Sequence, residues 1–219
     1  AAARKVKEAK NIPFLGTDSL TDILQMLIME TPGAGYIDVP NQKVLFDTPE
    51  VRAKVAWLVD LAKEGLVSLT SVGNYFSVDF GSSQVASYIG SSAGFPYINP
   101  DGFEFAMAPM PADTWYPSWN RGPIVFYYND DARAEGAYEF VKYFISPEVN
   151  AGWAESVIAL APYAWTRETD AYKAFIGKDS LANQALAAVQ GHLDKAGSLP
   201  AVTGANVVRN AIRDAIIKA

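Results

Sequence analysis

Two helix starts of the same kind constrain the fold of this chain more than any other local pattern. Thr-Pro-Glu at residues 48–50 and Ser-Pro-Glu at residues 146–148 each combine a capping hydroxyl, a proline at the first helical position and an acid in the first turn. Strand-like apolar runs lie between them, at residues 84–89, 103–107 and 124–128. This order of strands and helices predicts a mixed α/β fold in which helices dominate the second half.

The bulk composition excludes several classes of partner. The 219 residues suffice for one large domain or two small lobes, and with 50% hydrophobic and 19% charged residues the composition is that of a folded chain. The formal net charge is −6, and no basic cluster is present. Because nucleic-acid phosphates and anionic lipids require basic residues on one face, we expect neither as a partner.

The chain contains no cysteine, which excludes disulfides, thiolate catalysis and cysteine metal sites. The absence of cysteine fits an extracytoplasmic bacterial protein. No apolar run has the length of a membrane span. Residues 1–10 are typical of a helix fragment and not of a signal peptide, so we expect mature or cut material whose signal peptide is not in this chain.

Catalytic and metal-binding patterns have little support in the sequence. The single histidine, His192, lacks the neighbouring donors of a metal cluster or a serine triad. Gly-Ser-Ser-Ala-Gly at residues 90–94 is not a nucleophile elbow, and no phosphate-binding glycine motif follows a strand. Asp130 and Asp131 are explained by helix capping. We therefore expect no catalytic residues, no metal and no cofactor.

Small polar groups and aromatic residues gather instead on the expected loops. Aromatic faces pack on the C–H faces of a sugar or polyol, while hydroxyls, amides and backbone N–H groups satisfy its oxygens. Core packing explains each aromatic residue better when it is taken alone, but their common placement on loops favours binding. The candidate ligand-binding residues are Thr17, Asp18, Ser91, Ser92, Trp115, Trp119, Asn120, Gly122, Tyr163 and Arg209.

Five segments in a fixed order carry a resemblance that covers nearly the whole chain. They are Val-Leu-Phe-Asp-Thr-Pro-Glu at residues 44–50, Lys-Glu-Gly at 63–65, and the segments 80–91, 103–111 and 122–153. In this order they resemble the extracytoplasmic solute-binding proteins of ABC importers that take up sugars, maltodextrins and glycerol phosphates.

The resemblance implies a periplasmic-binding-protein type α/β fold with two lobes, a hinge of crossing strands and a ligand in the cleft between the lobes. It implies a sugar or polyol ligand, and a closed form that docks on the ABC permease subunits. It also implies an extracytoplasmic location, in the periplasm or anchored to the cell surface as a lipoprotein. Ser91 and Ser92 would face the ligand, and the tryptophan loop and the segment with Thr17 and Asp18 would form two further walls.

The sequence departs from the family pattern in its extent. Family chains are much longer, and the resemblance begins in the middle of their pattern. We therefore expect mainly the C-terminal lobe, in two parts at residues 1–83 and 116–219, with residues 84–115 recrossing to the N-terminal lobe. A separate N-terminal lobe or self-association would then cover the exposed strand edges.

Two motifs that bear on the ligand also differ from the family. Leu160 stands where the family motif carries a ligand-facing tyrosine, and the last motif, at residues 202–209, has no aromatic residue. The placement of Arg209 is similar to that in the glycerol-phosphate binders, and an arginine fork matches a phosphate. A solvent-facing helix residue is an equal interpretation of Arg209.

Two other functions remain open at this point. A glycan-acting enzyme would need two carboxylates, among Asp18, Asp113 and Glu168, within roughly 5–10 Å of each other across one aromatic cleft. A scaffold or interaction piece without a ligand would be recognised by its association with itself or with other chains.

Overall fold

The computed structural model describes the chain except for residues 73–74, 118–126, 128 and 201. The chain divides into two compact units, each of which is described by itself. Unit 1 comprises Ala1–Phe105, Met110–Ser118 and Asp194–Ala219, and unit 2 comprises Ala106–Pro109 and Trp119–Leu193. None of the described helices has the length and apolar character needed to cross a bilayer.

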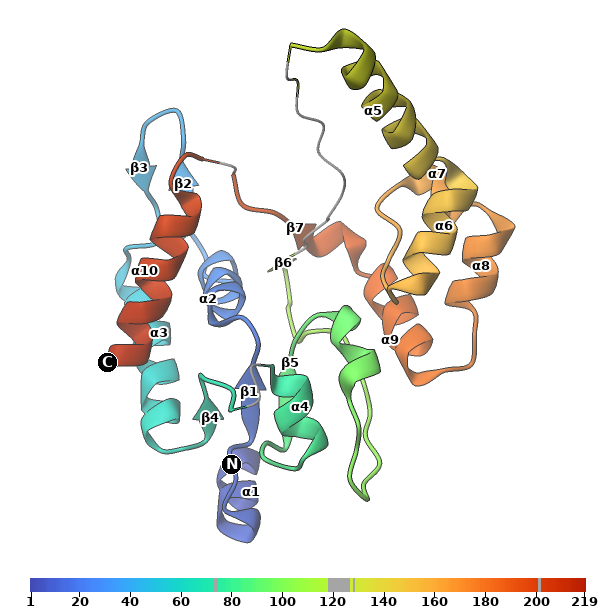
Figure 1. Cartoon of the computed structure of the whole chain (residues 1–219). Helices are drawn as coiled ribbons and strands as arrows, with labels where there is room; N and C mark the ends of the chain where they lie inside the picture. The colour runs from blue at the N-terminus through green and yellow to red at the C-terminus, as the bar shows by residue number, and fades with distance from the viewer. Residues whose placement is uncertain (73–74, 118–126, 128, 201) are drawn as a thin grey trace. The chain divides into compact units, whose positions relative to one another are not determined.

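Unit 1 contains a three-stranded parallel sheet, in which β1 (Leu15–Thr17) lies between β4 (Val67–Ser68) and β5 (Ser87–Ile89) (Figure 1). Leu15 pairs with both Val67 and Ser87, and Thr17 pairs with Ile89. Because the strands are parallel, the residues that follow β1 and β5 meet at one edge of the sheet.

Three helices build the core of unit 1 around this sheet: α2 (Leu20–Met29), α3 (Pro49–Lys63) and α10 (Ala205–Lys218). The apolar stripe of α2 contacts both α3 and α10. The buried core side chains are Leu20, Ile23, Leu24, Ile28, Val51, Leu58, Val67 and Ile216. The burial of each contributes roughly 1.5–3 kcal/mol.

The predicted helix starts at residues 48 and 146 are confirmed in position. The Thr48 hydroxyl accepts a hydrogen bond from Val51 N at 3.3 Å, and Pro49 opens α3. Pro147 opens α6 (Pro147–Ser156), but the Ser146 side chain makes no capping bond and donates instead to Tyr143 O at 2.7 Å.

Shorter elements complete unit 1. They are α1 (Ala2–Lys10), the antiparallel pair β2 (Ile37–Asp38) and β3 (Lys43–Val44), α4 (Phe76–Gly81), the 3-10 helices η1 (Ser92–Tyr97) and η2 (Leu193–Lys195), and the parallel pair β6 (Tyr116–Pro117) and β7 (Ala196–Gly197). Leu193, the first residue of η2, is the last residue of unit 2.

Unit 2 is helical in its described residues. Its helices are α5 (Asp131–Phe144), α6, α7 (Ala164–Arg167), α8 (Asp170–Ile176) and α9 (Leu181–Gln190). Its core consists of Ala151, Ala154, Ala161, Tyr172, Phe175 and Leu186. The core therefore comes from α6, α8, α9 and the segment after α6, while α5 contributes no buried side chain.

The two compact units do not coincide with the lobe segments predicted from the sequence, and the division into lobes stays a prediction. Residues 84–105 belong to unit 1, because β5 pairs with the central strand β1. Of the segment 84–115, which we expected to recross, Ala106–Pro109 alone falls in unit 2. The strand predicted at 103–107 is wrong, since these residues join no ladder, and most of the strand predicted at 124–128 lies outside the described residues.

Candidate functional site

The ends of β1 and β5 are tied together at the carboxyl edge of the sheet. Asp18 N donates to Ile89 O at 3.0 Å, which joins the first residue after β1 to the last residue of β5. The Thr17 side chain is buried, and its hydroxyl accepts a hydrogen bond from Ser19 N at 3.3 Å. The structure therefore places Thr17 and Asp18 next to the loop that follows residue 89, and their role at a ligand stays a prediction.

The Asp18 carboxylate connects this edge to α4. Its Oδ1 accepts a hydrogen bond from Phe76 N at 2.7 Å, at a helix start that has no cap from the side chain of Tyr75. A Cβ atom at position 90 would overlap Asp18 Oδ2, so a larger residue there would displace the carboxylate. Burial raises the pKa of Asp18, the Phe76 N–H opposes that shift, and the charge of Asp79 adds to it, with a net increase.

Tyr88 supports the same loop from within β5. Its ring packs against Gly90, where an added Cβ would lie 2.7 Å from Tyr88 Cε2, and against Phe80 at a ring-centroid distance of 5.5 Å. Burial and the negative charge of Asp18 raise the pKa of Tyr88 to about 12. The hydroxyl therefore stays protonated at neutral pH and can donate a hydrogen bond.

Ser91 and Ser92 begin the 3-10 helix that follows this strand. Ser91 is exposed, and its hydroxyl accepts a hydrogen bond from Ala93 N at 3.3 Å. Ser92 is half-buried. Both residues directly follow Gly90, which contacts Asp18, so the structure places them at the edge of the sheet that carries Asp18.

A polar pocket opens beside Asp18, between the start of α2 and one face of α10. Its volume is about 370 Å³, within the range of roughly 300–1,000 Å³ that is usual for small-molecule sites. It is lined by Asp18, Ser19, Leu20, Thr21, Asn206, Arg209, Asn210 and Arg213. The pocket thus joins residues from the two ends of the chain.

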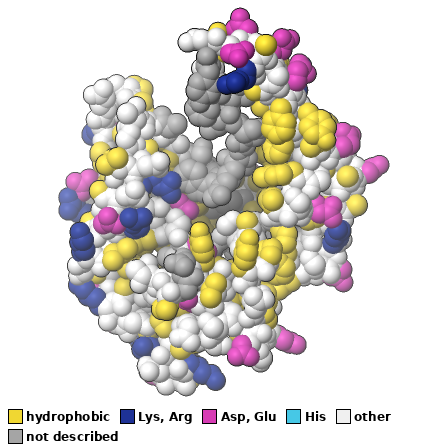
Figure 2. All heavy atoms as spheres, viewed as in Figure 1, with side chains coloured by type: hydrophobic (Ala, Val, Ile, Leu, Met, Phe, Trp, Pro, Cys, Tyr) yellow, Lys and Arg dark blue, Asp and Glu magenta, His cyan; other side chains and the backbone are white. Residues whose placement is uncertain are grey.

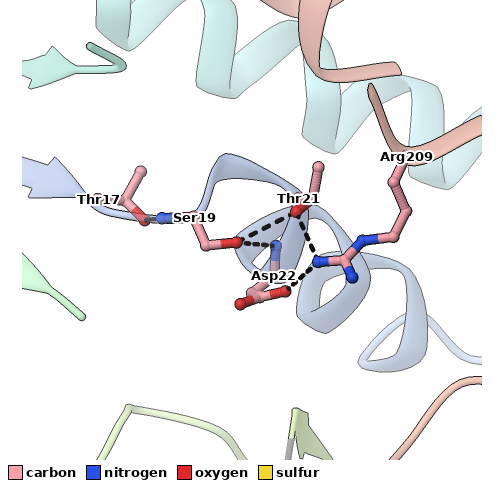
Figure 3. Close-up of polar contacts among 5 residues, drawn as sticks. All are labelled: Thr17, Ser19, Thr21, Asp22 and Arg209. Atoms are coloured by element: carbon pink, nitrogen blue, oxygen red, sulfur yellow. Dashed lines mark hydrogen bonds and ion pairs between the residues drawn. The ribbon is translucent and has the colours of Figure 1, made fainter. Parts of the chain in front are cut away.

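Arg209 is held at the wall of this pocket by residues of α2 (Figure 3). Its Nη2 donates to Thr21 Oγ1 and to Asp22 Oδ1, both at 3.0 Å. Ser19 Oγ lies 3.1 Å from Thr21 Oγ1 and accepts a hydrogen bond from Asp22 N at 3.3 Å. The side chains of Arg209 and Asp22 are each 24% exposed, so the ion pair is partly shielded from water.

Trp115 has a structural role in unit 1. Its backbone N–H donates to Glu30 Oε1 at 2.6 Å, and the backbone N–H of Thr114 donates to the same oxygen at 2.7 Å. Burial favours the neutral acid of Glu30, but the hydrogen bonds outweigh it and lower the pKa. The indole packs onto Gly197, where a Cβ would lie 2.7 Å from Trp115 Cε2. Trp115 is not among the residues that line the pocket.

The remaining predicted residues fall elsewhere. Tyr163 belongs to unit 2, where it stacks on Trp165 with ring centroids 4.6 Å apart and planes at 10°. Trp119, Asn120 and Gly122 lie outside the described residues. Their role at the ligand stays a prediction.

Of the residues that line the pocket, Asp18 and Arg209 were among the sequence candidates, whereas Ser19, Leu20, Thr21, Asn206, Asn210 and Arg213 were not. Asn206, Arg209, Asn210 and Arg213 recur at the spacing of three and four residues that places side chains on one face of a helix. This polar face of the expected C-terminal helix could have been recognised from the sequence. Ser19 and Thr21 carry no comparable signal, because hydroxyls are common at any helix start.

Metal ligands and enzyme carboxylates are two further kinds of site on which the described part of the chain bears. No group of three or more His, Asp or Glu side chains there is placed to hold a metal ion. Of the carboxylates considered for an enzyme, Asp18 caps α4 in unit 1, whereas Glu168 lies in unit 2 and pairs with Lys173 at 3.3 Å.

The family model described as bacterial extracellular solute-binding protein matches residues 1–184. No curated protein sequence matches the chain.

Solved structures match the fold. The cyclic alpha-maltosyl-1,6-maltose binding protein from Arthrobacter globiformis has a TM-score of 0.71 and 22% identity, and the match covers 99% of this chain and 56% of that protein. A putative oligosaccharide periplasmic-binding protein from Synechococcus sp. MITs9220 has a TM-score of 0.66 and 16% identity. The match covers 99% of this chain and 58% of that protein. The maltose/maltodextrin-binding domain MalE from Bdellovibrio bacteriovorus, bound to maltotriose, has a TM-score of 0.64 and 17% identity. The match covers 94% of this chain and 54% of that protein. The chain thus has the α/β fold of periplasmic sugar-binding proteins and spans little more than half of their length.

Proposed function

Because the chain belongs to the family of bacterial extracellular solute-binding proteins, we propose that it forms part of the solute receptor of an ABC importer and binds a sugar or polyol. The proposal includes an extracytoplasmic location and delivery of the ligand to the permease, as the family implies. It includes no catalytic step, since the family and the similar structures are solute-binding proteins.

The pocket at the carboxyl edge of the sheet of unit 1 is the observation that carries the proposal. In α/β folds, ligands bind in crevices outside the carboxyl ends of parallel strands. Asp18 follows the central strand of this sheet, and its carboxylate has Oδ2 directed at Gly90 next to the two serines. We assign the ligand to this pocket and to the adjoining residues Ser91 and Ser92.

The polar groups of the pocket suit a ligand rich in hydroxyls. Asp18 accepts hydrogen bonds, Arg213 donates them, and the amides of Asn206 and Asn210 do both. A sugar hydroxyl donates and accepts at the same time, so each of these groups can find a partner on it. The Arg209–Asp22 pair adds no net charge to the pocket wall.

A phosphorylated polyol is the second candidate ligand. Two guanidinium groups, those of Arg209 and Arg213, line the pocket, and such groups bind phosphate in a fork geometry. A phosphate would have to compete with Asp22 for Arg209 Nη2, which favours the neutral ligand over the anionic one.

Calorimetry tests the proposal and separates the two ligand classes. Maltose, maltotriose, glycerol and glycerol 3-phosphate are titrated into the complete natural polypeptide that contains this chain. Asn206→Ala and Asn210→Ala should each weaken binding by about 2- to 10-fold, as the loss of a hydrogen bond of about 0.5–1.5 kcal/mol requires. Gln84→Ala, at the opposite end of β5, should not change it. Absence of binding heat from every one of these ligands contradicts the proposal.

A further inference from the structure

Asp101 and Gly102 form an exposed bend in unit 1, after the 3-10 helix η1. They end the sequence Asn-Pro-Asp-Gly at residues 99–102, whose composition is typical of a turn. Gly102 has a φ of +74°, and a Cβ there would meet no atom within 4 Å. Exposure alone does not distinguish Asp101, because acidic side chains stand at the surface at several separate places on the face shown in Figure 2. The glycine that follows Asp101 distinguishes it from the other aspartates.

The two backbone N–H groups of this bend are bonded differently. Asp101 N donates to Gly81 O at 3.1 Å, which holds the start of the bend on the C-terminal end of α4. Gly102 N makes no hydrogen bond to any residue that the structure describes. Because Gly102 has no side chain and its N–H is held by no acceptor, this nitrogen can approach the carboxyl carbon of Asp101.

Two other exposed aspartates are followed by a backbone nitrogen that is hydrogen-bonded. After Asp113, Thr114 N donates to Glu30 Oε1 at 2.7 Å. After Asp179, Ser180 N donates to a backbone carbonyl at 2.9 Å. A nitrogen held in this way is kept away from the preceding carboxyl group, and the side chains of threonine and serine hinder the approach further. These two positions therefore serve as comparisons within the same protein.

We infer that Asp101 is a site of spontaneous covalent modification, at which aspartate converts to isoaspartate through a succinimide. Gly102 N attacks the side-chain carboxyl carbon of Asp101 and loses its proton, and the carboxyl OH leaves as water. Water then opens the five-membered imide at either of its two carbonyl carbons, which gives aspartate or isoaspartate without a net change in mass. The conversion needs no oxidant or reductant, and the inference does not depend on the ligand proposed above.

Isoaspartate at this position changes the packing of the residues that follow the bend. The main chain then runs through the side chain of residue 101 and is longer by one bond, about 1.5 Å. The Phe103 ring packs edge-on against Phe80 with centroids 5.3 Å apart, and Phe80 contacts Tyr88 at 5.5 Å. A longer main chain displaces the Phe103 ring, so the modified fraction should unfold at a lower urea concentration. Equal urea midpoints of the modified and unmodified fractions would contradict this consequence.

Ageing of the complete natural polypeptide that contains this chain tests the inference. The protein is kept at 37 °C for several weeks at pH 5 and at pH 8 and is then digested. Isoaspartate peptides keep their mass but elute separately, and mass spectrometry quantifies them. Isoaspartate should form at Asp101 about tenfold faster than at Asp113 or Asp179, a difference of about 1.4 kcal/mol in activation free energy. The rate at Asp101 should be higher at pH 5, because the carboxyl group must be protonated for its OH to leave as water.

Two variants and a denaturant complete the test. Asp101→Glu keeps the charge but would need a six-membered ring, so it should abolish the isomerised product. Asp101→Asn keeps the five-membered ring with ammonia as the leaving group, so it should still give isoaspartate, and faster at pH 8 than at pH 5. Urea frees the nitrogens after Asp113 and Asp179 and should raise the rates there more than at Asp101. Isoaspartate that forms at residue 101 only in urea, or no faster than at the two comparison positions in the folded protein, overturns the inference.

Discussion

The guanidinium of Arg209 donates to the carboxylate of Asp22 at 3.0 Å, although the two residues are 187 positions apart in the chain. The contact ties the last helix of unit 1 to the helix that follows its central strand, and it does so at the wall of the polar pocket. The same contact therefore serves the stability of unit 1 and the shape of the pocket.

Arg209→Ala should lower the free energy of unfolding by about 1.5–3 kcal/mol, the usual contribution of a hydrogen bond to a charged group. The partly shielded position of the pair, with each side chain 24% exposed, places the effect above that of a surface ion pair. Urea denaturation measures it. Arg133→Ala is the control, since Arg133 is 74% exposed in its pair with Asp130, and its effect should stay within about 0.5 kcal/mol. Equal effects of the two substitutions would contradict the prediction.

Gly90→Ala should disturb the pocket edge through Asp18. An added Cβ would overlap Asp18 Oδ2 and would lie 2.7 Å from the Tyr88 ring, so the carboxylate and the ring would have to move. Overpacking of this kind lowers the free energy of unfolding by about 1–3 kcal/mol. Chemical denaturation should show this loss, and calorimetry of the complete polypeptide should show weaker ligand binding.

Gly136→Ala is the control for that substitution. A Cβ at Gly136 has open space around it, and alanine is the better helix former by about 0.8–1 kcal/mol in the middle of a helix. The change should therefore stabilise α5 or leave it unaltered. If Gly136→Ala lowered the free energy of unfolding as much as Gly90→Ala, the loss at Gly90 could not be attributed to steric overlap with Asp18 and Tyr88.

Local signals in the sequence predicted those parts of the fold and site that depend on neighbouring residues. The helix starts at residues 48 and 146 follow from cap and proline chemistry alone, and the strand before Gly90 follows from its apolar run. The proximity of Asp18 to Ser91, by contrast, comes from the parallel pairing of β1 with β5, which no local signal predicts. The helix starts and the strand before Gly90 needed no knowledge of distant contacts.

Distant contacts decided the rest. The alternating residues 103–107 have the period of a strand but no ladder partner in the structure. The sequence does not predict that the Trp115 indole packs on Gly197 or that the Trp115 backbone N–H binds Glu30, both far away in the chain, and a role of Trp115 at a ligand stays a prediction. The role of Arg209 as a partner of Asp22 likewise cannot be read from either residue alone.

The stability of unit 1 should depend on pH through Asp18 in an unusual direction. Burial raises the pKa of Asp18 above its ordinary value of 3.8, so the folded state binds more protons than the unfolded state between the two pKa values. The contribution of Asp18 to stability is therefore lost as the pH rises through that window. Asp18→Asn should remove this dependence. Measured from pH 3 to pH 7, the free energy of unfolding of the variant should therefore rise relative to that of the unsubstituted protein as the pH increases.

Glu30 provides the control of opposite sign. Burial acts to raise the pKa of Glu30, but the hydrogen bonds from the backbone of Trp115 and Thr114 outweigh it. The pKa therefore lies below the ordinary value of 4.5. Its contribution is therefore present above pH 4.5 and is lost as the pH falls through the folded-state pKa. Glu30→Gln should flatten the acid side of the stability curve. If Asp18→Asn and Glu30→Gln changed the pH dependence of the unfolding free energy in the same direction, the raised pKa of Asp18 and the lowered pKa of Glu30 could not both be right.

The 219-residue chain alone should bind sugars and glycerol 3-phosphate weakly or not at all. Its pocket in unit 1 offers one wall of polar groups, and the chain spans 54–58% of the solved binding proteins that it resembles. A ligand held on one side keeps the remaining half of its polar groups in water and gains little from closure of the lobes. Calorimetry on the chain, beside the complete polypeptide, measures the difference. Micromolar affinity in the 219-residue chain would mean that unit 1 by itself completes the site.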